Sequence, residues 1–559
     1  MSQLSVKFNL IEGVNVNSST PLYDVEHDCN NDKHAIVQMK NDWGHLVIWG
    51  DVAQKHQDAK IWHNVQDNQS PSVAGRSWIF INKLTRTVFA GCDSFGLFPV
   101  FLYQCDDTII IASSRQALVK QLGKPLSLDT DAMRCMLTFG QLFNESSILK
   151  DTQHIGASST FSLSLTSERL FELTTNPLIG FPRENTTRFK DALEAVVESV
   201  RSSVTNCENP MLSLSGGLDS RLILACCEAL NVKLPALCYG NKLSADARIA
   251  NELAAACNIS LLTSTDLTGH ITETNSRRIA FAGQGEVPVH HAHALIDESL
   301  IEATKHHTLL TGTGAETYRA FYYDRGMPGF SAFGLKCLNK LTIPRVKRYI
   351  TEEYGKTASA AYTLFPQHAE QLQSQVTELL LALNDNAFSA AQYADNFYLR
   401  VRAARMVVAG QQLLDEDYNR THPFLSPEVV TSIGSLPARY KLSSAFHRKA
   451  ICKLSPKLGD IEWDKTSKPL NQGLTLFQRY PGLASRLGLN NFFGKSAAPM
   501  FQYKYSDHTS HSLCAVLKYV GIDNAKSMRD CYEEMEKAGT LTHALGLAAV
   551  WQHLLHERP

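Results

Sequence analysis

Residues 210–224 read PMLSLSGGLDSRLIL, an apolar run that breaks at Ser215-Gly216-Gly217 and then resumes with apolar periodicity. The pattern predicts a strand, a loop and a helix that begins near residue 218. A turn that only reverses the chain does not need two glycines, two hydroxyls and a carboxylate together. Glycine lets the backbone approach an anion closely, and the start of a helix offers N–H groups to it. The loop therefore predicts an anion-binding site.

The carboxylate at Asp219 narrows the kind of site. A carboxylate repels an anion unless a cation lies between them, so Asp219 favours a Mg²⁺ ion that bridges to phosphate oxygens. Ser215 and Ser220 add hydroxyl donors. The GK[ST] ending of a Walker A loop is missing. The sequence thus predicts a nucleotide–Mg²⁺ loop, and a glycine-rich βα turn with a helix-capping aspartate is the alternative.

Downstream of this loop, strand-like and helix-like stretches alternate. Ser244 is a plausible N-cap of the second helix. The expected strands cover 234–240, 259–263 and 308–314, and the expected helices cover 218–230, 244–257 and 294–305. This alternation predicts a parallel sheet covered by helices, with ligands at the carboxyl ends of its strands.

The first 175 or so residues have a different character. Short apolar runs are separated by turn residues, which favours a largely antiparallel β domain. The expected strands are 45–53, 77–83, 87–93, 100–104 and 108–114. A helical stretch starts near residue 184, residues 180–188 are the expected linker, and the pattern beyond about residue 335 is mostly helical.

Composition sets the broad class. A chain of 559 residues exceeds the size of one hydrophobic core, so two or more domains are expected. A net charge of −1 without a basic stripe argues against a nucleic-acid partner. No apolar run approaches the roughly 20 residues of a membrane helix, and the N-terminus lacks a signal-peptide pattern. The 13 cysteines form no CxxC pairs, which favours free thiols in a reducing cytoplasm.

SGGLDS resembles the loop of the ATP pyrophosphatases, which cleave ATP to AMP and pyrophosphate while activating a substrate. Further segments resemble asparagine synthetases, in the same order along about residues 40–470. They are CDSFGLFPVFLYQ (92–104) with IIASSRQALVKQ (110–121), CYGNKLSADARIANELA (238–254), LLTGTGAETY (309–318) and RTHPFL (420–425). On these motifs the chain resembles the asparagine synthetase superfamily.

The resemblance implies two domains. Residues 1–182 would form an α+β sandwich of the Ntn-hydrolase type, a degenerate glutaminase domain. Residues 183–559 would form an α/β parallel-sheet ATP-pyrophosphatase domain, the synthetase, with a helical C-terminal part.

The glutaminase of this family needs a cysteine directly after the initiator methionine as its nucleophile. Here that position is Ser2, and the nearest cysteine is Cys29. Trp49-Gly50-Asp51 stands where the family has its oxyanion asparagine, and the family's RGPD motif is missing. The N-terminal domain is therefore expected to be catalytically inert.

The resemblance also implies roles for single residues. Asp219 and Glu316 would be the Mg²⁺ ligands, with Glu316 in the place of an aspartate. Thr313 would contact the substrate as a catalytic residue, where asparagine synthetases have Glu and β-lactam synthetases have Tyr. The implied nucleotide-binding residues are Leu214, Ser215, Gly216, Gly217, Asp219, Ser220, Tyr239, Gly240, Gly312 and Gly314.

LSPKLGDIEWDKTSKPL (454–470) resembles the segment that carries the family's catalytic lysine. That lysine stabilises negative charge during adenylation and amide formation. Counting from the proline places it at Lys465, and Lys468 is the alternative.

The expected function is an ATP- and Mg²⁺-dependent ligase that adenylates a carboxylate and joins it to an amine other than ammonia. Lasso-peptide cyclases and β-lactam synthetases, the branch without a glutaminase, close amide rings in natural-product and antibiotic biosynthesis. Lasso-type macrolactam closure ranks ahead of β-lactam closure on this resemblance. The substrate would be a small-molecule or peptide carboxylate, and a lasso role implies a precursor peptide and a processing protease.

Two alternatives remain open. One is an amidation of the asparagine type that uses free ammonia. The other is a non-catalytic binding protein on a synthetase scaffold, against which the intact loop argues.

Two weaker features complete the candidates. His290, His291 and His293 lack the i, i+4 spacing of a helical metal site, and we expect a helix that lines the substrate pocket. Asp395 and Glu416 are candidates for a general base that deprotonates the amine, with no preference between them.

Overall fold

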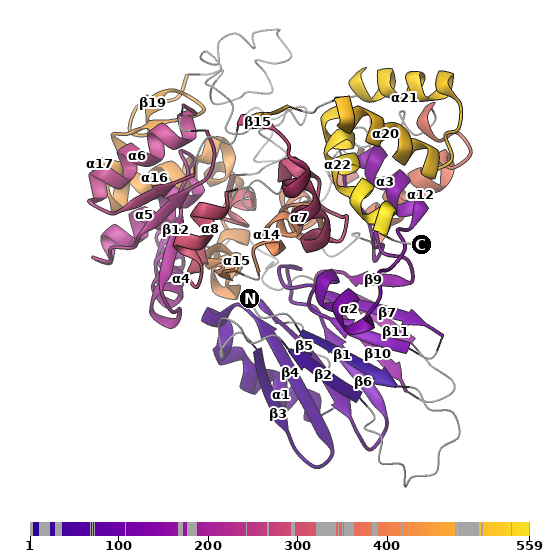
Figure 1. The fold of residues 1–559 in the computed structure, drawn as a ribbon. Helices are drawn as coiled ribbons and strands as arrows, with labels where there is room; N and C mark the ends of the chain where they lie inside the picture. The colour runs from indigo at the N-terminus through magenta and orange to yellow at the C-terminus, as the bar shows by residue number, and fades with distance from the viewer. Residues whose placement is uncertain are drawn as a thin grey trace.

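The computed structural model contains two antiparallel sheets and one parallel sheet (Figure 1). It describes residues 4–9, 23–27, 36–165, 171–175, 187–319, 343–350, 363–382, 390–475, 478, 502–504 and 507–557, with gaps at 68, 70, 72, 107, 242, 265–267, 292–296, 345, 349, 416 and 538. The presence of both antiparallel and parallel sheets confirms the mixed α/β class expected from the sequence. The expected boundary at 182/183 lies outside the described residues.

The antiparallel sheets form the N-terminal part, and the strands expected there all form with slightly shifted ends. Their orders are β2-β1-β8-β7-β9 and β11-β10-β6-β5-β4-β3. The strands are β1 (Leu4–Asn9), β2 (Tyr23–His27), β3 (Ile36–Lys40), β4 (Gly44–Gly50), β5 (Arg76–Asn82), β6 (Thr87–Gly91), β7 (Val100–Cys105), β8 (Thr108–Ala112), β9 (Thr152–Ile155), β10 (Ser159–Ser164) and β11 (Phe171–Thr175). The helices are η1 (Val52–Gln57), α1 (Asp58–Gln66), α2 (Arg115–Leu122) and α3 (Thr130–Phe139).

The centre of the strand β5, WIFI (78–81), is apolar at every position, and its packing shows why. Successive side chains of a strand point to opposite faces. Ile79 and Ile81 belong to the large core that both sheets share, whereas Trp78 and Phe80 pack in a smaller cluster with residues of α1. Both faces of β5 are therefore buried, and the alternation of a half-exposed strand is lost.

The parallel sheet has the order β14-β13-β12-β16-β17. The β-α-β-α-β expectation is confirmed, with shorter strands than expected. Its elements are α4 (Phe189–Asn206), β12 (Pro210–Ser213), α5 (Asp219–Ala229), β13 (Ala236–Cys238), α6 (Ala245–Cys257), β14 (Leu261–Thr263), α8 (Glu298–Thr304), β16 (Thr308–Leu310) and β17 (Asn419–Thr421). A separate core forms between β12, β13 and the helices α4, α5, α6 and α16.

The other elements surround this sheet or connect it to the N-terminal part. They are β15 (Thr268–His270), α7 (Glu273–Gly283), η2 (Val289–His291), η4 (Ala315–Arg319), α12 (Ala369–Ala382), α13 (Ala390–Phe397), η6 (Tyr398–Val407), α14 (Val408–Gln412), η7 (Pro423–Leu425), α15 (Pro427–Gly434), η8 (Ala438–Tyr440), η9 (Leu442–Ser444), α16 (Ala445–Leu454), α17 (Pro456–Gly459), β18 (Glu462–Trp463), β19 (Lys468–Pro469), β20 (Gln502–Lys504), α20 (Asp507–Tyr519), α21 (Ala525–Lys537) and α22 (Leu541–Glu557). The helix α22 contacts α7, α3 and the other C-terminal helices, and α20–α22 lie away from α5 and α6 (Figure 1).

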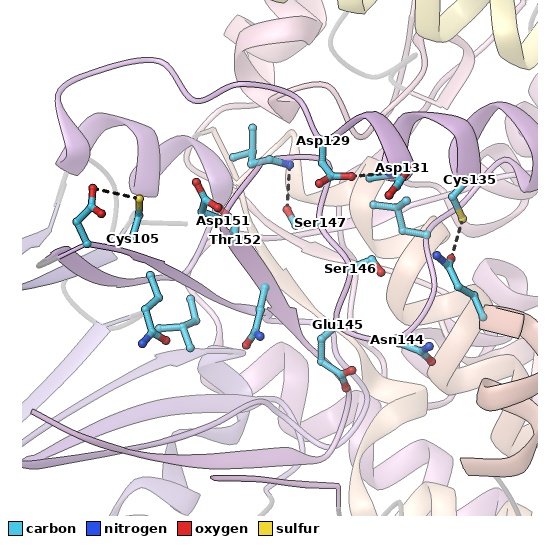
Figure 2. Close-up of a pocket in the computed structure, with 18 residues that line it drawn as sticks. Cys105, Asp129, Asp131, Cys135, Asn144, Glu145, Ser146, Ser147, Asp151 and Thr152 are labelled. Carbon is cyan, nitrogen blue, oxygen red and sulfur yellow. Dashed lines mark hydrogen bonds between the residues drawn. The ribbon is translucent and has the colours of Figure 1, made fainter. Parts of the chain in front are cut away.

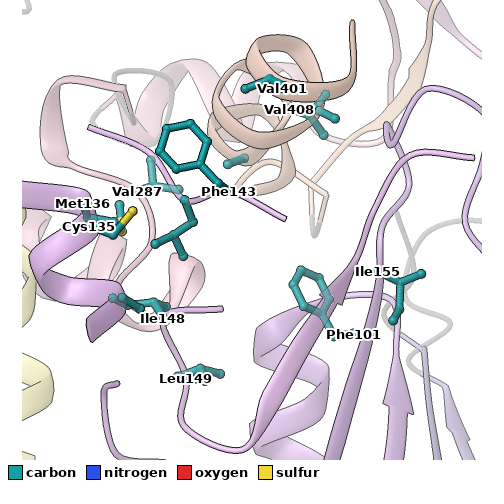
Figure 3. Close-up of a cluster of buried hydrophobic side chains, with 14 of the residues drawn as sticks. Phe101, Cys135, Met136, Phe143, Ile148, Leu149, Ile155, Val287, Val401 and Val408 are labelled. Carbon is teal, nitrogen blue, oxygen red and sulfur yellow. The ribbon is translucent and has the colours of Figure 1, made fainter. Parts of the chain in front are cut away.

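One hydrophobic core runs across the junction of the N-terminal part with the rest of the chain. Figure 3 shows members of this core from both sides of the junction, Phe101 and Ile155 of the first sheet and Val401 and Val408 on η6 and α14. Polar contacts join the same elements, because Arg400 Nη1 donates to the carbonyl of Ala157 at 2.9 Å. Burial of this junction fixes η6 against the antiparallel sheets.

Asp51 forms a second link across this junction. It is buried, and its Oδ1 accepts from the backbone N–H of Ala53 at 2.9 Å. Its Oδ2 accepts from the Thr421 hydroxyl at 3.0 Å and from the His422 N–H at 3.1 Å. Burial raises the pKa of Asp51, and these hydrogen bonds oppose the rise. Asp51, which directly follows β4, therefore holds β17 in place.

We expect Asp51→Ala to destabilise the protein by about 2–5 kcal/mol, because it leaves buried donors without an acceptor. Thermal melting should show a midpoint several degrees below that of the wild type. Asp67→Ala, which removes an exposed carboxylate next to α1, is the matched control and should melt like the wild type. Equal melting of the two variants would contradict the proposed link.

Two further expectations from the sequence concern the cysteines and membrane-spanning helices. The cysteines there are free thiols, and most are buried. Among the same residues, no helix combines the length and the apolar character needed to cross a bilayer.

Candidate functional site

The SGGLDS loop joins β12 to α5, as the sequence predicts. The backbone N–H of Ser215 donates to the Ser220 hydroxyl at 3.0 Å, and the two hydroxyl oxygens lie 3.3 Å apart. Leu218 precedes α5, and no side chain caps this helix, unlike α6, where Ser244 accepts from Ala247 N–H. An uncapped helix start keeps its N–H groups available for an anion. Asp219 is the first residue of the helix and does not cap it.

The half-buried Asp246 and the buried Arg221 hold the backbone of the loop in place. Asp246 accepts from the Gly216 N–H at 3.1 Å, and Arg221 Nη2 donates to the Gly216 carbonyl at 3.2 Å. Arg221 also donates to the carbonyls of Ile461 at 3.0 Å and Glu462 at 2.7 Å. Burial lowers the pKa of Arg221 to about 10, so it stays charged at neutral pH. The loop is thus fixed before any ligand binds.

A cavity of about 420 Å³ opens beside the loop. Its volume is in the range of small-molecule sites. It is lined by Ser213, Ser215, Asp219, Ser220, Tyr239, Leu309, Thr311, Gly312, Thr313, Glu316, Arg402, Met406, Val407, Gly410, Gln411, Leu414 and Arg420. Expected residues that follow β12, β13 and β16, among them Ser215, Tyr239 and Gly312, therefore line one cavity, because parallel strands end at the same edge of a sheet.

Gly312 allows the two strand ends to approach each other. A Cβ atom at this position would lie 2.8 Å from Cβ of Asp219 and 3.4 Å from the Ser220 nitrogen. Another neighbour of Asp219 is the buried His447, whose Nε2 lies 3.1 Å from Asp219 Oδ1. Gly312 thus packs against the Cβ of Asp219, and His447 lies against its carboxylate.

Asp219 and Glu316 line the same cavity from different strand ends. Glu316 Oε2 accepts from the backbone N–H of Gly314 at 3.1 Å. Mg²⁺ prefers oxygen ligands and often takes one or two carboxylates, with phosphate oxygens and water completing its shell. The described residues contain no group of three or more His, Cys, Asp or Glu side chains that could hold a metal. Two carboxylates beside a phosphate-type loop fit Mg²⁺ bound together with a nucleotide.

Sequence reasoning missed the part of the cavity wall that lies outside the parallel sheet and its loops. Residues 398–407 form a π-helix, η6, which continues into α14. These elements contribute Arg402, Met406, Val407, Gly410 and Gln411, and Leu414 follows just after α14. π-Helices are rare and frequently occur at functional sites, but their i→i+5 pattern leaves no familiar signal in a sequence. Arg420, which also lines the cavity, belongs to RTHPFL (420–425), a segment already named in the sequence analysis.

The charges in this wall are partly paired. Asp415 accepts from Arg420 Nε at 2.6 Å and from Nη2 at 3.0 Å. Such a bidentate pair holds the guanidinium in one orientation.

Burial and the adjacent Tyr418 raise the pKa of Tyr239 well above its usual range, so Tyr239 lines the cavity as a neutral side chain.

The structure does not bring the other implied residues into the cavity lining. Leu214 is buried, and its N–H donates to the Leu237 carbonyl. Gly240 exchanges hydrogen bonds with the Ser264 hydroxyl, and Gly216, Gly217 and Gly314 are backbone neighbours of the lining residues. Lys465 and Lys468 are both exposed, and Lys465 Nζ lies 5.8 Å from the Trp463 ring centre. The role of Lys465 stays a prediction.

Two weaker expectations turn out differently. His290 packs against His543 of α22, with ring centres 5.2 Å apart, and does not line the cavity. Burial lowers the pKa of His290 to about 4. Asp395 is buried and forms an ion pair with Lys441, whose Nζ lies 2.5 Å from Asp395 Oδ2. Asp395 lies outside the cavity, so it is not a base there. Glu416, His293 and the side chain of His291 lie outside the described residues.

A larger cavity, of about 710 Å³, lies elsewhere, between β7, β9, α3 and α12 (Figure 2). None of the residues implied by the loop motifs lines it. Two of its carboxylates have structural partners, because Asp129 caps α3 and Asp131 pairs with Arg134. We assign the candidate site to the smaller cavity, where the loop residues converge.

No family model matches the chain, and no curated protein sequence matches it. Among solved structures, the chain is similar to the glutamine phosphoribosylpyrophosphate (PRPP) amidotransferase from B. subtilis complexed with ADP and GMP. The identity is 7%, the match covers 47% of this chain and 84% of that chain, and the TM-score is 0.19. A likeness at this TM-score supports no inference about function.

Proposed function

We propose that the protein is an ATP- and Mg²⁺-dependent ligase that adenylates a carboxylate, releases pyrophosphate and forms an amide with an amine other than ammonia. The observation that carries the proposal is the convergence of Ser215, Asp219, Ser220, Thr313 and Glu316 on one cavity. The resemblance of SGGLDS to the ATP-pyrophosphatase loop supports the choice of ATP. Ring closure within one activated molecule, of the lasso or β-lactam type, is the finer proposal.

In this proposal, the residues that line the cavity would have the following roles. The loop hydroxyls and the N–H groups of α5 bind phosphate oxygens. Tyr239 and the η6–α14 wall enclose the substrate and exclude water from the reacting groups. Arg402 brings a positive charge to the cavity lining, where it would stabilise a carboxylate substrate or a developing negative charge.

Asp219 and Glu316 would hold Mg²⁺ together with the bound nucleotide. When bound, the ion neutralises charge on the phosphates and on the leaving pyrophosphate. His447 orients the Asp219 carboxylate from the protein side.

We expect the purified chain to bind Mg–ATP in a calorimetric titration. With a pool of amino acids and carboxyl-bearing peptides, labelled pyrophosphate should enter ATP, and AMP should form, because the loop lacks the lysine of a Walker A site. Chromatography of the spent nucleotide distinguishes AMP from ADP, and ADP as the main product would contradict the proposal. Ammonium salts should not raise the rate, and a rise would favour amidation of the asparagine type.

A further inference from the structure

The hydroxyl of Thr313 sits at the centre of a hydrogen-bond network on the cavity wall. Its oxygen accepts from the Thr311 hydroxyl at 3.0 Å and from the side-chain amide of Gln411 at 2.7 Å. A hydroxyl has two lone pairs and one hydrogen. Both acceptor positions of Thr313 are therefore taken if these two neighbours are the donors.

Arg420 determines which groups donate to Thr313, because a guanidinium group only donates hydrogen bonds. Its Nη1 lies 3.4 Å from Gln411 Oε1 and 3.4 Å from His422 Nε2. Both atoms must therefore accept. The amide of Gln411 then presents its NH₂ group to Thr313, and the His422 ring carries its hydrogen on Nδ1. The pair with Asp415 keeps Arg420 in the orientation that sets these directions.

The second branch runs through His422 and Thr311. Burial and the charge of Arg420 lower the pKa of His422 well below its usual range, so the ring is neutral. Its Nδ1–H donates to Thr311 Oγ1 at 2.7 Å, and the backbone N–H of Thr313 reaches the same oxygen at 3.4 Å. Thr311 is left with its own hydrogen, which it donates to Thr313. Both branches therefore run from Arg420 toward Thr313.

We propose that Thr313 donates its hydroxyl hydrogen to a phosphate oxygen of the nucleotide bound in this cavity. The inference rests on the proposed function, which places a nucleotide there. Gln411, His422 and Thr311 act as positioning residues, because they occupy the lone pairs of Thr313 and leave only its hydrogen for a ligand. A phosphate oxygen only accepts, so it matches this hydrogen. The same occupancy prevents Thr313 from acting as a general base.

The test is a double-mutant cycle, with calorimetric titration of the full chain by Mg–ATP. We expect Thr313→Val to weaken binding about 10- to 100-fold, the range for a hydrogen bond to a charged acceptor. Thr313→Ser keeps the hydroxyl and should bind like the wild type. Gln411→Glu replaces a donor by an acceptor and draws the Thr313 hydrogen to itself. In that background Thr313→Val should therefore cost little.

The cycle cancels the added charge of Gln411→Glu, because Thr313→Val is compared within each background. Gln411→Glu alone should also weaken binding more than Gln412→Glu, which adds the same charge one residue further along, outside the cavity lining. This second comparison applies even if Thr313→Val does not fold.

Binding of Mg–ATP by Thr313→Val at wild-type affinity would overturn the inference. An equal loss in both Gln411 backgrounds would overturn it as well, because that is expected if Thr313 only fills space. Equal affinities of Gln411→Glu and Gln412→Glu would argue against the direction of the network. A wild-type chain that binds no Mg–ATP contradicts the proposed function itself.

Discussion

Replacing Asp219 by alanine is expected to abolish ATP–pyrophosphate exchange while the fold stays intact. The carboxylate lies at the cavity, caps no helix, and keeps about 20% of its side-chain surface exposed, so its loss removes little packing. A lost metal ligand costs several kcal/mol of charge stabilisation, and each 1.36 kcal/mol is about tenfold in rate. The exchange rate should therefore fall by at least about 10³-fold.

Asp219→Asn is the matched variant, because it keeps the shape of the side chain and removes only the charge. It should be as inactive as Asp219→Ala. Thermal melting of both variants checks the fold, since the buried His447 loses its carboxylate neighbour. Exchange near the wild-type rate in either variant would mean that Asp219 does not bind the metal.

Gly312→Ala should have the second-largest effect, although it adds only one methyl group. The new Cβ would lie 2.8 Å from Cβ of Asp219, closer than real Cβ atoms approach their neighbours. Either the end of β16 or the Asp219 side chain must move. A misplacement of about 1 Å in a reacting group costs about 100-fold in rate. We expect an exchange rate lower by about this factor and weaker binding of Mg–ATP.

Gly473→Ala is the control for this change. A Cβ at Gly473 would meet no atom within 4 Å, and its backbone is not left-handed, so exchange should be unaffected. Exchange rates in Gly312→Ala and Gly473→Ala that do not differ would show that the contact between Gly312 and Asp219 has no part in the reaction.

Much of the candidate site could be predicted from local sequence. The strand, loop and helix at residues 210–229 follow from a change of apolar period around two glycines. The pairing of Asp219 with Glu316 came from the resemblance of LLTGTGAETY to a family motif, and both residues line one cavity because parallel strands end at one edge of a sheet. The N-cap at Ser244 was equally local and is confirmed.

Other features depend on segments that are distant in the sequence. Arg221 holds the loop through the carbonyls of Ile461 and Glu462, and His290 finds its partner at His543. Neither contact has a local pattern, because the side chains meet only when separate helices pack. The π-helix wall is similar, since its pitch differs from the 3.6-residue period by which a helix is recognised.

The sequence by itself determined that an antiparallel β part precedes a parallel α/β part, where the SGGLDS loop lies, and which polar side chains this loop carries. Only the tertiary structure decided which of these groups share a cavity, which lysines stay at the surface, and which way the hydrogen bonds around Thr313 run. The physical reason is the separation along the sequence over which each kind of interaction acts. Periodicity and turn chemistry act over a few residues, whereas a directed network needs Arg420, His422 and Gln411 to meet Thr313 across about 100 positions of chain.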